Sequence, residues 1–495
     1  MKSWIKINEK DNVIVALKNL GTGETFTVGK TAVILRDEIK RGHKAALLKI
    51  SKGENVIRYG FPIGHAIREI QPGEHVHTHN VKTNLSGPNS YTFNQNIPPL
   101  NIENRNLTLR GYRRYNGNIG IRNELWIVPT IGCVNKMAEN IILRFKSEVQ
   151  PQGIDAIEAF KHPWGCSELG EDHVNLKAFL GNIVKHPNAA GVLVFGLGCE
   201  ENQVDEFMES LGDYDEKRVK FLIAQDVSDE IEEGVKILTT LYENAKNDAR
   251  EDIPLSELTV GLKCGGSDGL SGITANPLLG AFSDFLIAQG GTTVMTEVPE
   301  MFGAETILME RAIDRTVFEK IVNLINDFKN YFLNHNQPVD ENPSPGNKEG
   351  GITTLEEKSL GCTQKGGKAP VVDVLEYGRS VSKKGFHLLN APGNDLAATP
   401  ALAAAGCQMV LFTTGRGTPY GTFVPTLKIS TNTPLYEKKP HWIDFNAGTL
   451  AEDKDIEKLR EELIDYIISV ANGEKVNNEK NNFREIALFK TGVTV

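Results

Sequence analysis

Short apolar runs separated by glycine-containing turns occupy the first 85 residues of the chain. The runs lie at residues 12–17, 31–35 and 55–60. Runs of this length that are rich in β-branched residues and bounded by turn residues are typical of short β-strands. The pattern therefore predicts a small all-β module over residues 1–85.

The pattern is lost in the next segment. Residues 86–106 are polar and rich in proline and asparagine, and their apolar residues follow neither a helical nor a strand period. Segments of this composition form linkers rather than packed elements. We therefore predict a linker without ordered secondary structure.

Beyond the linker, apolar runs alternate with amphipathic stretches. Nearly continuous apolar runs lie at residues 124–130, 190–196, 258–263, 291–297 and 409–415, and helical patterns lie at 135–146 and 227–247. Strands that alternate with helices are typical of α/β domains with a mostly parallel sheet. The polar segment near residue 250 divides this part into a second α/β domain, 107–250, and a C-terminal α/β domain, 251–495.

The composition indicates a globular protein that acts on a small molecule. The 495 residues exceed what one hydrophobic core covers, and the 24% of charged residues is ordinary. The net charge of -10, from 54 basic and 64 acidic residues without long basic runs, argues against nucleic-acid and membrane partners. We expect a small-molecule substrate, which needs local cationic groups if it is an anion.

The cysteines and the N-terminal residues favour a cytoplasmic protein. The first ten residues contain no apolar signal core, and no run approaches the length of about 18 apolar residues that a membrane span needs. The six cysteines are far apart and form no Cys-x-x-Cys pair. We expect reduced thiols.

Three histidines alternate with other residues in the segment 73–80. On an extended strand His75, His77 and His79 would all point to one face. Imidazoles bind zinc, iron, nickel and copper, so the spacing predicts a metal site but does not identify the metal. The outer pair on such a strand starts roughly 13 Å apart, so we expect one ion to bind at most two adjacent histidines.

The third histidine of this strand is then left to orient the substrate or exchange a proton. A half-exposed strand with polar residues facing outward is the structural alternative. His43 and His65 are further candidates that could face the histidine strand, although a single histidine often has only a structural role.

Five of the six cysteines directly follow a glycine, and several of these pairs come after a predicted strand. Ligands of parallel sheets bind at the carboxyl ends of the strands. An alternative to the histidine site is therefore an iron–sulfur cluster held by Cys133, Cys166 and Cys362. Each cysteine taken alone is equally explained by packing.

Polar loops supply candidate substrate ligands. The loop 264–272 is glycine-rich but matches neither phosphate-binding nor dinucleotide-binding motifs, which argues against nucleotide binding. Its free N–H groups and short oxygen-bearing side chains suit hydroxyl or carboxylate ligands. The loop 296–305 carries three glutamates that could bind a hard cation. The candidate substrate-binding residues are Ser267, Asp268, Asn394, Asp395 and Arg416.

Together these motifs resemble those of the altronate/galactarate dehydratase family over essentially the whole chain. The matching segments are the histidine strand and residues 118–124, 165–167, 196–200, 264–272, 297–303, 358–365 and 414–421. The resemblance implies an N-terminal β-clip domain of the SAF type, a second domain that forms a dimer, and a Rossmann-like C-terminal domain. It also implies dehydration of D-altronate to 2-dehydro-3-deoxy-D-gluconate in hexuronate breakdown, with Fe²⁺ as cofactor.

The residues agree with that chemistry, and some alternatives stay open. Loss of water from a 2,3-dihydroxy acid requires removal of a weakly acidic proton and protonation of the leaving hydroxyl. We assign His75 and His77 to metal binding or proton transfer, and Arg122 and Arg416 to the substrate carboxylate. Ser267, Asp268, Asn394 and Asp395 are assigned to substrate hydroxyls or the metal. Mn²⁺ as the ion, galactarate as the substrate, an iron–sulfur dehydratase and a non-catalytic sugar-acid sensor are the alternatives.

Overall fold

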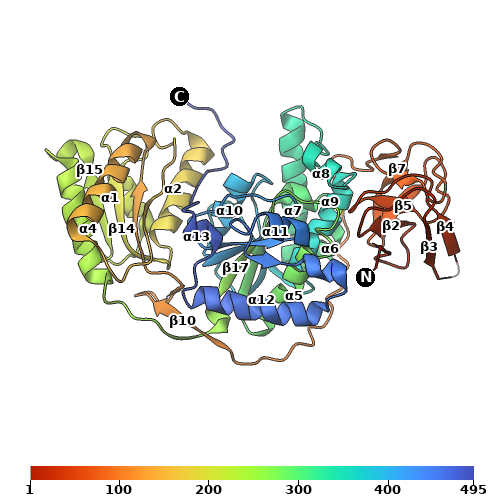
Figure 1. Cartoon of the computed structure of the whole chain (residues 1–495). Coiled ribbons are helices and arrows are strands. Elements are labelled where there is room, and N and C mark those ends of the chain that lie inside the picture. Colours follow the sequence, from red (N-terminus) through yellow and green to blue (C-terminus); the bar gives the residue numbers. More distant parts are fainter. Residues whose placement is uncertain (1, 30) are drawn as a thin grey trace.

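The protein forms three lobes in a row, and their order in space differs from their order in the sequence (Figure 1). The computed structural model describes residues 2–29 and 31–495. The N-terminal β module lies at one end, the C-terminal α/β domain lies in the middle, and the second domain lies at the other end. The linker therefore has to cross the C-terminal domain to reach the second domain.

The β module is built from small antiparallel sheets, as the sequence predicted. One sheet has the order β1-β2-β5-β8, a second is the hairpin β3-β4, and a third has the order β6-β7-β9. Alternating strand residues face two apolar clusters, of which one contains Val13 and the other Ile14. The strands are β1 (Trp4–Ile5), β2 (Val13–Ala16), β3 (Thr25–Val28), β4 (Thr31–Ile34), β5 (Lys44–Ala46), β6 (Asn55–Arg58), β7 (Phe61–Ala66), β8 (His75–Val76) and β9 (Val81–Lys82).

The linker is extended. Residues 83–107, all of which the structure describes, contain neither helix nor strand. Tyr91, Phe93, Leu100 and Ile102 nevertheless pack against the core of the C-terminal domain. The side-chain amide of Gln95 also donates hydrogen bonds to backbone carbonyls of that domain. The linker is thus anchored along its length by side chains rather than by secondary structure.

The second domain has a parallel sheet with the order β13-β12-β14-β15 and helices on both faces. Leu125 and Ile127 of β12 pack with residues of α1 and α4, whereas Trp126 and Val128 pack with residues of α2 and α3. The strand is thus buried on both faces, which agrees with the nearly continuous apolar run at residues 124–130. The elements are β12 (Glu124–Pro129), β13 (Ile157–Ala159), β14 (Ala189–Gly196), β15 (Val219–Ile223), α1 (Asn135–Val149), α2 (Gly170–Val184), α3 (Val204–Leu211) and α4 (Glu230–Ala245).

The chain enters and leaves the second domain through two adjacent strands. β10 (Thr108–Arg113) and β16 (Glu251–Pro254) pair antiparallel, with Leu109 opposite Ile253, and β11 (Ile119–Gly120) pairs with the other edge of β10. The second domain is therefore attached to the C-terminal domain by a short sheet as well as by packing.

The C-terminal domain contains a parallel sheet with the order β19-β20-β18-β17-β21-β22-β23. Helices α5 (Ala275–Ala288), α7 (Arg315–Asn334) and α12 (Ile456–Ala471) contribute to one apolar cluster with this sheet, and α10 (Asp395–Ala404) contributes to another. This arrangement confirms the predicted α/β class. The strands are β17 (Thr259–Cys264), β18 (Thr292–Met295), β19 (Val371–Leu375), β20 (Gly385–Leu389), β21 (Met409–Thr414), β22 (Thr426–Ser430) and β23 (Phe445–Asn446).

The three lobes share buried apolar contacts. Trp126 of the second domain lies 5.7 Å from Phe423 of the C-terminal domain, measured between ring centroids. Ala304 and Leu360 of the C-terminal domain belong to the same apolar cluster as Val13 of the β module. These contacts fix the position of each outer lobe on the central domain.

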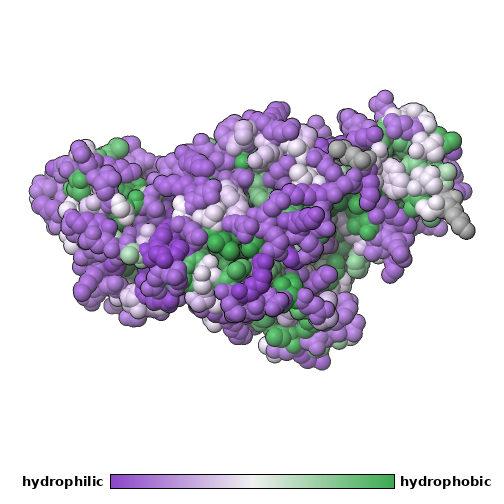
Figure 2. Space-filling view, turned by 60° about the horizontal axis from the view of Figure 1, so that its bottom comes forward, coloured by the Kyte–Doolittle hydropathy of each residue, from purple (hydrophilic) through white to green (hydrophobic). Residues whose placement is uncertain are grey.

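The face of the molecule shown in Figure 2 is largely polar. Figure 2, which turns the lower side of Figure 1 toward the viewer, shows a mostly hydrophilic face with hydrophobic patches near its middle. Among the residues that the structure describes, none of the helices combines the length and apolar character that a membrane crossing requires.

Candidate functional site

The strand order of the C-terminal domain creates a switch point next to β17. The chain passes from β17 to β18 on one side of the sheet and later returns to β21 on the other side. Ligands of open α/β sheets bind where such neighbouring loops diverge at the carboxyl ends of the strands. Here the N–H groups of Gly415 and Arg416, after β21, donate to the carbonyl of Gly266, after β17, at 3.1 and 3.0 Å. The glycine-rich loop therefore lies where a ligand is expected.

The β module docks beside this loop, on the segment that comprises α8 (Pro345–Glu349) and α9 (Leu355–Cys362). Thr354 donates a hydrogen bond to the carbonyl of Ile63 at 2.5 Å. Arg58 of the module donates to the carbonyl of Gly269 at 2.7 Å and forms an ion pair with Glu357. The docking contacts are thus polar, buried and directed at the functional loops.

This docking brings three histidines of the module together. The ring centroids of His43, His75 and His77 lie 5.1 to 5.5 Å from one another. Nδ1 of His43 is 3.0 Å from Nε2 of His75. Two groups of the C-terminal domain hold the cluster: the carbonyl of Glu349 faces Nε2 of His43 at 3.1 Å, and the hydroxyl of Thr353 lies 3.0 Å from Nδ1 of His77.

The prediction that His75, His77 and His79 lie on one extended strand is wrong. The strand β8 covers only His75 and Val76, and the chain then turns, with the N–H of Asn80 donating to the carbonyl of His77 at 3.0 Å. As a result the ring of His79 lies only 5.3 Å from that of His75. The turn, which alternation alone does not reveal, replaces the wide spacing of a straight strand.

Burial makes the clustered imidazoles weak bases. Desolvation, followed by nearby positive charges such as Lys44, lowers the pKa of His77 to about 3. Desolvation and the neighbouring His43 lower the pKa of His75 to about 4, and burial also lowers the pKa of His43. All three rings are therefore neutral near pH 7, the form that accepts a proton or binds a metal.

The histidine cluster fits a metal ion only in part. The carbonyl of Glu349 holds the N–H of His43 on Nε2, which leaves Nδ1 free beside Nε2 of His75, as in metal sites where a carbonyl orients the ligand. The 3.0 Å between these nitrogens is compatible with two ligands of one ion. His77 is turned toward Thr353 and does not complete a close set of three donors.

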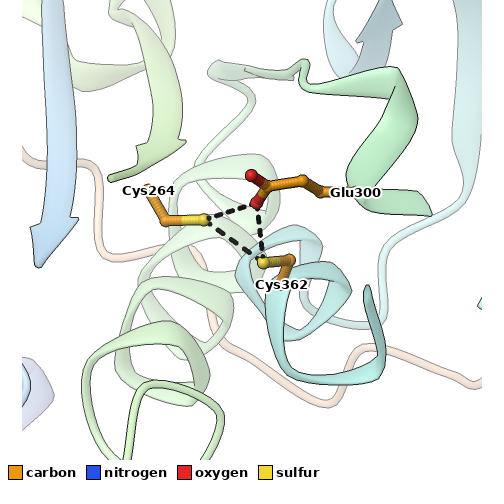
Figure 3. Close-up of side chains that lie close together, drawn as sticks. All are labelled: Cys264, Glu300 and Cys362. Carbon is orange, nitrogen blue, oxygen red and sulfur yellow. Dashed lines mark hydrogen bonds between the residues drawn. The ribbon is translucent and has the colours of Figure 1, made fainter. Parts of the chain in front are cut away.

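A closer set of donors lies at the ends of β17 and α9 (Figure 3). Within the described residues, Cys264, Glu300 and Cys362 are the group of His, Cys, Asp or Glu side chains whose ligand atoms all lie within 4.8 Å of one another. The two sulfurs are 3.3 Å apart, and Oε2 of Glu300 lies 3.3 Å from Cys264 and 3.0 Å from Cys362. All three side chains are buried.

Lysines surround this cysteine–glutamate set. Nζ of Lys365 lies 2.9 Å from Sγ of Cys264, and Nζ of Lys358 lies 2.8 Å from Glu300. Burial by itself would raise the pKa of Glu300, but Lys358, Lys263 and Lys365 outweigh it and lower that pKa to about 2. Glu300 is therefore a carboxylate at any physiological pH.

Two of the predicted substrate-binding residues hold the glycine-rich loop itself. Asp268 accepts hydrogen bonds from Ser271, Thr431 and Asn432, at 3.1, 3.0 and 3.2 Å. The carbonyl of Ser267 accepts a hydrogen bond from Asn347 at 2.8 Å. The structure thus places both residues at the switch point, with Asp268 already engaged by protein donors.

Three other predicted residues lie around the same edge of the sheet. Asn394 caps α10 by accepting from the N–H of Ala397 at 3.2 Å, and Asp395 forms an ion pair with the buried Lys263 at 2.8 Å. Arg416 pairs with Glu349 at 2.9 Å, and its side chain is 43% exposed. Arg416 therefore remains accessible to a ligand.

The structure does not bring Arg122 to the histidines. Its guanidinium is buried, pairs with Glu479 at 2.7 Å and donates to the carbonyls of Ile121, Val470 and Glu474. This residue ties the start of the second-domain sheet to the C-terminal helices. The structure corrects the predicted catalytic role of Arg122 to a structural one, because the N–H groups on every side of its guanidinium already donate to protein acceptors.

The predicted cluster of Cys133, Cys166 and Cys362 is also corrected. Cys133 and Cys166 are exposed and lie in loops of the second domain, whereas Cys362 is buried beside Cys264 in the C-terminal domain. A preceding glycine therefore did not identify the converging pair, since Cys264 follows Lys263. Position at the end of an apolar run would have been a better signal for residues that converge, because Cys264 and Glu297 both lie at such a position.

Three sequence models of one family match the chain in succession. They describe the SAF domain of altronate/galactarate dehydratases, matching residues 2–84, the second domain of D-galactarate dehydratase/altronate hydrolase, matching 111–246, and the C-terminal domain of D-galactarate/altronate dehydratases, matching 255–494.

Individual relatives agree with these matches. The chain is 60% identical to a Bacillus subtilis (strain 168) protein named altronate dehydratase, with all of both chains covered. It is 57% identical to an Escherichia coli (strain K12) protein of the same name, covering 99% of this chain and 100% of that one. A galactarate dehydratase (L-threo-forming) of Escherichia coli (strain K12) is 32% identical, covering 95% and 93%.

Proposed function

The chain belongs to the D-galactarate/altronate dehydratase family, and we propose that it is a hydro-lyase that converts D-altronate to 2-dehydro-3-deoxy-D-gluconate and water. The observation that carries this proposal is the 60% identity to an altronate dehydratase over the full length of both chains. The histidine cluster at the switch point supports it, because the reaction requires two proton transfers at one ligand site.

In the proposed reaction a neutral imidazole takes the proton from C2 of the substrate. The C3–oxygen bond then breaks, and the hydroxyl leaves as water after it receives a proton. The resulting enol rearranges to the 2-keto acid. His75 and His77 are assigned to these transfers: one ring, neutral near pH 7, takes the C2 proton, and the imidazolium so formed returns a proton to the leaving hydroxyl, directly or through the neighbouring ring. His79, whose ring lies beside His75, is assigned to proton exchange or substrate orientation.

The substrate carboxylate is assigned to Arg416, the accessible arginine at the switch point. Ser267, Asn394 and Asp395, at the same edge of the sheet, are assigned to the sugar hydroxyls. Fe²⁺, or Mn²⁺ in its place, would when bound stabilise the negative charge that develops on the substrate carboxylate after C2 loses its proton. The candidate ligands for that ion are the cysteine–glutamate set, or His75 together with His43, whose nitrogens lie 3.0 Å apart. His77, which the sequence suggested as a second ligand, is turned toward Thr353.

Turnover on defined sugar acids tests the proposal. Anaerobically prepared full-length protein, supplied with Fe²⁺, is assayed on D-altronate and on galactarate with a coupled assay for the 2-keto-3-deoxy acid. We expect turnover on altronate, and a large loss of it in His77→Ala with an unchanged circular dichroism spectrum. The matched control is His65→Ala, since His65 is hydrogen-bonded to Asn84 away from the cluster.

Two outcomes would reject parts of this proposal. Preferred turnover of galactarate would assign the chain to the other substrate of the family, which carries a second carboxylate. Near-normal turnover in His77→Ala would remove that residue from the mechanism. Without turnover of any sugar acid, the hydro-lyase assignment itself would fail.

Family membership also supports three wider proposals: a role in hexuronate breakdown, a homodimer and a cytoplasmic location. The six cysteines are all free thiols, which agrees with a reducing compartment. Light scattering of the purified protein measures the oligomeric state, and a monomeric mass would contradict the dimer.

A further inference from the structure

We propose that Cys264, Glu300 and Cys362 form a binding site for one thiophilic divalent metal ion. The site is inferred from side chains on three separate elements, β17, the 3-10 turn that follows β18, and α9. Identifying the ion as the iron of a dehydratase rests on the proposed function, whereas the existence of the site does not.

The separations between the donor atoms fit one ion. Two ligand atoms on a tetrahedral ion with bonds of about 2.0–2.3 Å lie roughly 3.3–3.8 Å apart. The observed separations are 3.3 Å between the sulfurs, and 3.3 and 3.0 Å from each sulfur to Glu300. Figure 3 shows the three side chains pointing toward one another from their separate elements. Two sulfurs on such an ion would lie roughly 3.8 Å apart, and a sulfur and an oxygen roughly 3.5 Å apart, so an ion would require each separation to widen by about 0.2–0.5 Å.

The surrounding charges also balance for a divalent ion. Lys263, Lys358 and Lys365 supply three positive charges in this buried network, and Glu297, Glu300 and Asp395 supply three negative charges. Metal binding requires that both cysteines become thiolates, which leaves the network with two excess negative charges. One divalent cation neutralises that excess.

Contacts outside the three ligands orient their donor atoms. Nζ of Lys365 lies 2.9 Å from the sulfur of Cys264. Lys358 holds the second oxygen of Glu300 at 2.8 Å, which leaves Oε2 directed at the two sulfurs. Groups that orient the ligands in this way are a regular part of metal sites.

The donor chemistry limits which ions fit. Two sulfurs and one carboxylate select ions such as Fe²⁺, Co²⁺ and Zn²⁺ over Mg²⁺ and Ca²⁺, which prefer oxygen alone. A set of three protein ligands leaves a fourth coordination position on a tetrahedral ion. The segment 345–362 contacts both sites. Its Glu349 and Thr353 contact the histidines, whereas its Cys362 is one of the three proposed ligands and its Lys358 pairs with Glu300.

Cobalt is the probe for this site, since thiolate–Co²⁺ bonds give intense charge-transfer absorption in the near ultraviolet. Metal-free full-length protein is titrated anaerobically with Co²⁺. We expect this absorption to saturate at one equivalent per chain, to disappear in Cys264→Ser and Cys362→Ser, and to persist in His75→Ala and His77→Ala. Cys407→Ser is the matched control, because Cys407 is also buried but belongs to the apolar core.

Glu300→Gln should retain the sulfur absorption and bind Co²⁺ at least tenfold more weakly. Because a serine variant could fail to fold, wild-type protein gives a second measurement. Bound Co²⁺ should slow alkylation of Cys264 and Cys362 in unfolding-limited labelling, and should leave the alkylation of the exposed Cys133 unchanged.

The proposal is overturned if Co²⁺ binds without sulfur absorption, if the absorption survives in both serine variants, or if it is lost only in the histidine variants. None of these measurements uses a sugar acid. Absent absorption with intact altronate turnover would therefore reject the site and keep the proposed function, and the reverse result would reject the function and keep the site.

Discussion

Lys44 of the β module donates hydrogen bonds to both carboxylate oxygens of Glu357 on α9, at 2.7 and 2.9 Å, and neither side chain is more than 1% exposed. Glu357 also pairs with Arg58, so one buried carboxylate forms ion pairs with two cations from the other domain. Burial lowers the pKa of Lys44 to about 8, and Glu357 keeps it charged at neutral pH. This carboxylate is the electrostatic centre of the contact that assembles the histidine cluster.

Glu357→Gln should therefore loosen the β module. Removal of one member of a buried ion pair leaves its partner uncompensated and costs about 3–5 kcal/mol. We expect lower stability in urea unfolding and faster proteolysis of the linker. Lys49→Met is the control, because its ion pair with Glu69 is 56% and 49% exposed and should change stability by less than about 1 kcal/mol. Equal effects of the two substitutions would contradict this account of the contact.

His43 should prove as important for turnover as the histidines of the predicted strand. Its ring bridges the carbonyl of Glu349 and Nε2 of His75, so His43→Ala removes the group that orients His75. We expect a fall in kcat of about 10²-fold or more, with partial recovery in His43→Asn, whose amide oxygen can replace Nδ1 as an acceptor. A kcat for His43→Ala within twofold of wild type would show that the cluster does not act as a unit.

Arg416→Met should raise KM for altronate and leave stability almost unchanged. The Arg416 side chain is 43% exposed and its partner Glu349 is 70% exposed, so the ion pair contributes at most about 1 kcal/mol. The loss of a bidentate carboxylate contact should instead appear in steady-state kinetics on altronate. An unchanged KM would exclude Arg416 from substrate binding.

Arg122→Met should show the opposite behaviour. The loss of a buried guanidinium that pairs with Glu479 should destabilise the protein by about 3–5 kcal/mol. Thermal unfolding measures this effect, and KM of the protein that remains folded should equal that of wild type. A specific rise in KM at full stability would restore the substrate-binding role that the sequence suggested for Arg122.

His186 should make the junction of the second and C-terminal domains sensitive to acid. In its neutral form Nε2–H donates to the carbonyl of Cys407 at 3.3 Å, and Nδ1 accepts from the N–H of Asn188 at 3.2 Å. Burial lowers the pKa of His186 to about 4 in the folded protein. In the unfolded chain its pKa is near 6.5, so as the pH falls the unfolded chain is protonated at a higher pH than the folded protein. Stability contributed by the neutral form is present above about pH 6.5 and is lost as the pH falls toward about 4, to a maximum of about 3 kcal/mol.

His186→Gln tests this assignment, since glutamine keeps a donor and an acceptor but does not titrate. The Tm of the variant should fall by less than that of wild type between pH 7 and pH 4.5, whatever the stability of the variant at pH 7. The two proteins should respond alike between pH 7 and pH 9. Parallel Tm curves below pH 6.5 would show that His186 does not carry the effect.

The fold was largely predictable because its signals are local. The runs that became β12, β14, β17, β18 and β21 are short, apolar and separated by helical patterns, and those of the β module are separated by glycine turns. The site was less predictable. Alternation placed the histidines on a straight strand, but the turn after Val76 depends on hydrogen bonds of Asn80 that no periodicity reveals.

Partners that are distant in sequence were the hardest to predict. His43 and Glu349 are 306 residues apart, and Cys264 and Cys362 are 98 residues apart, so spacing carries no information about either contact. For Arg122 the motif suggested the family, but it also suggested a role in substrate binding. Only the structure shows that the Arg122 guanidinium pairs with the buried Glu479 instead. Residue type indicates which chemistry is possible, whereas topology decides which residues perform it.

The docking of the first lobe on α9 also affects biosynthesis. Lys44 leaves the ribosome 313 residues before Glu357, which at roughly 5–20 residues per second is a delay of about 15–60 s. During translation the nascent module exposes uncompensated Lys44 and Arg58 and an unfinished apolar cluster. Protection of that surface by a chaperone, until α9 has emerged, would be a direct result of separating the two halves of the contact by 313 residues.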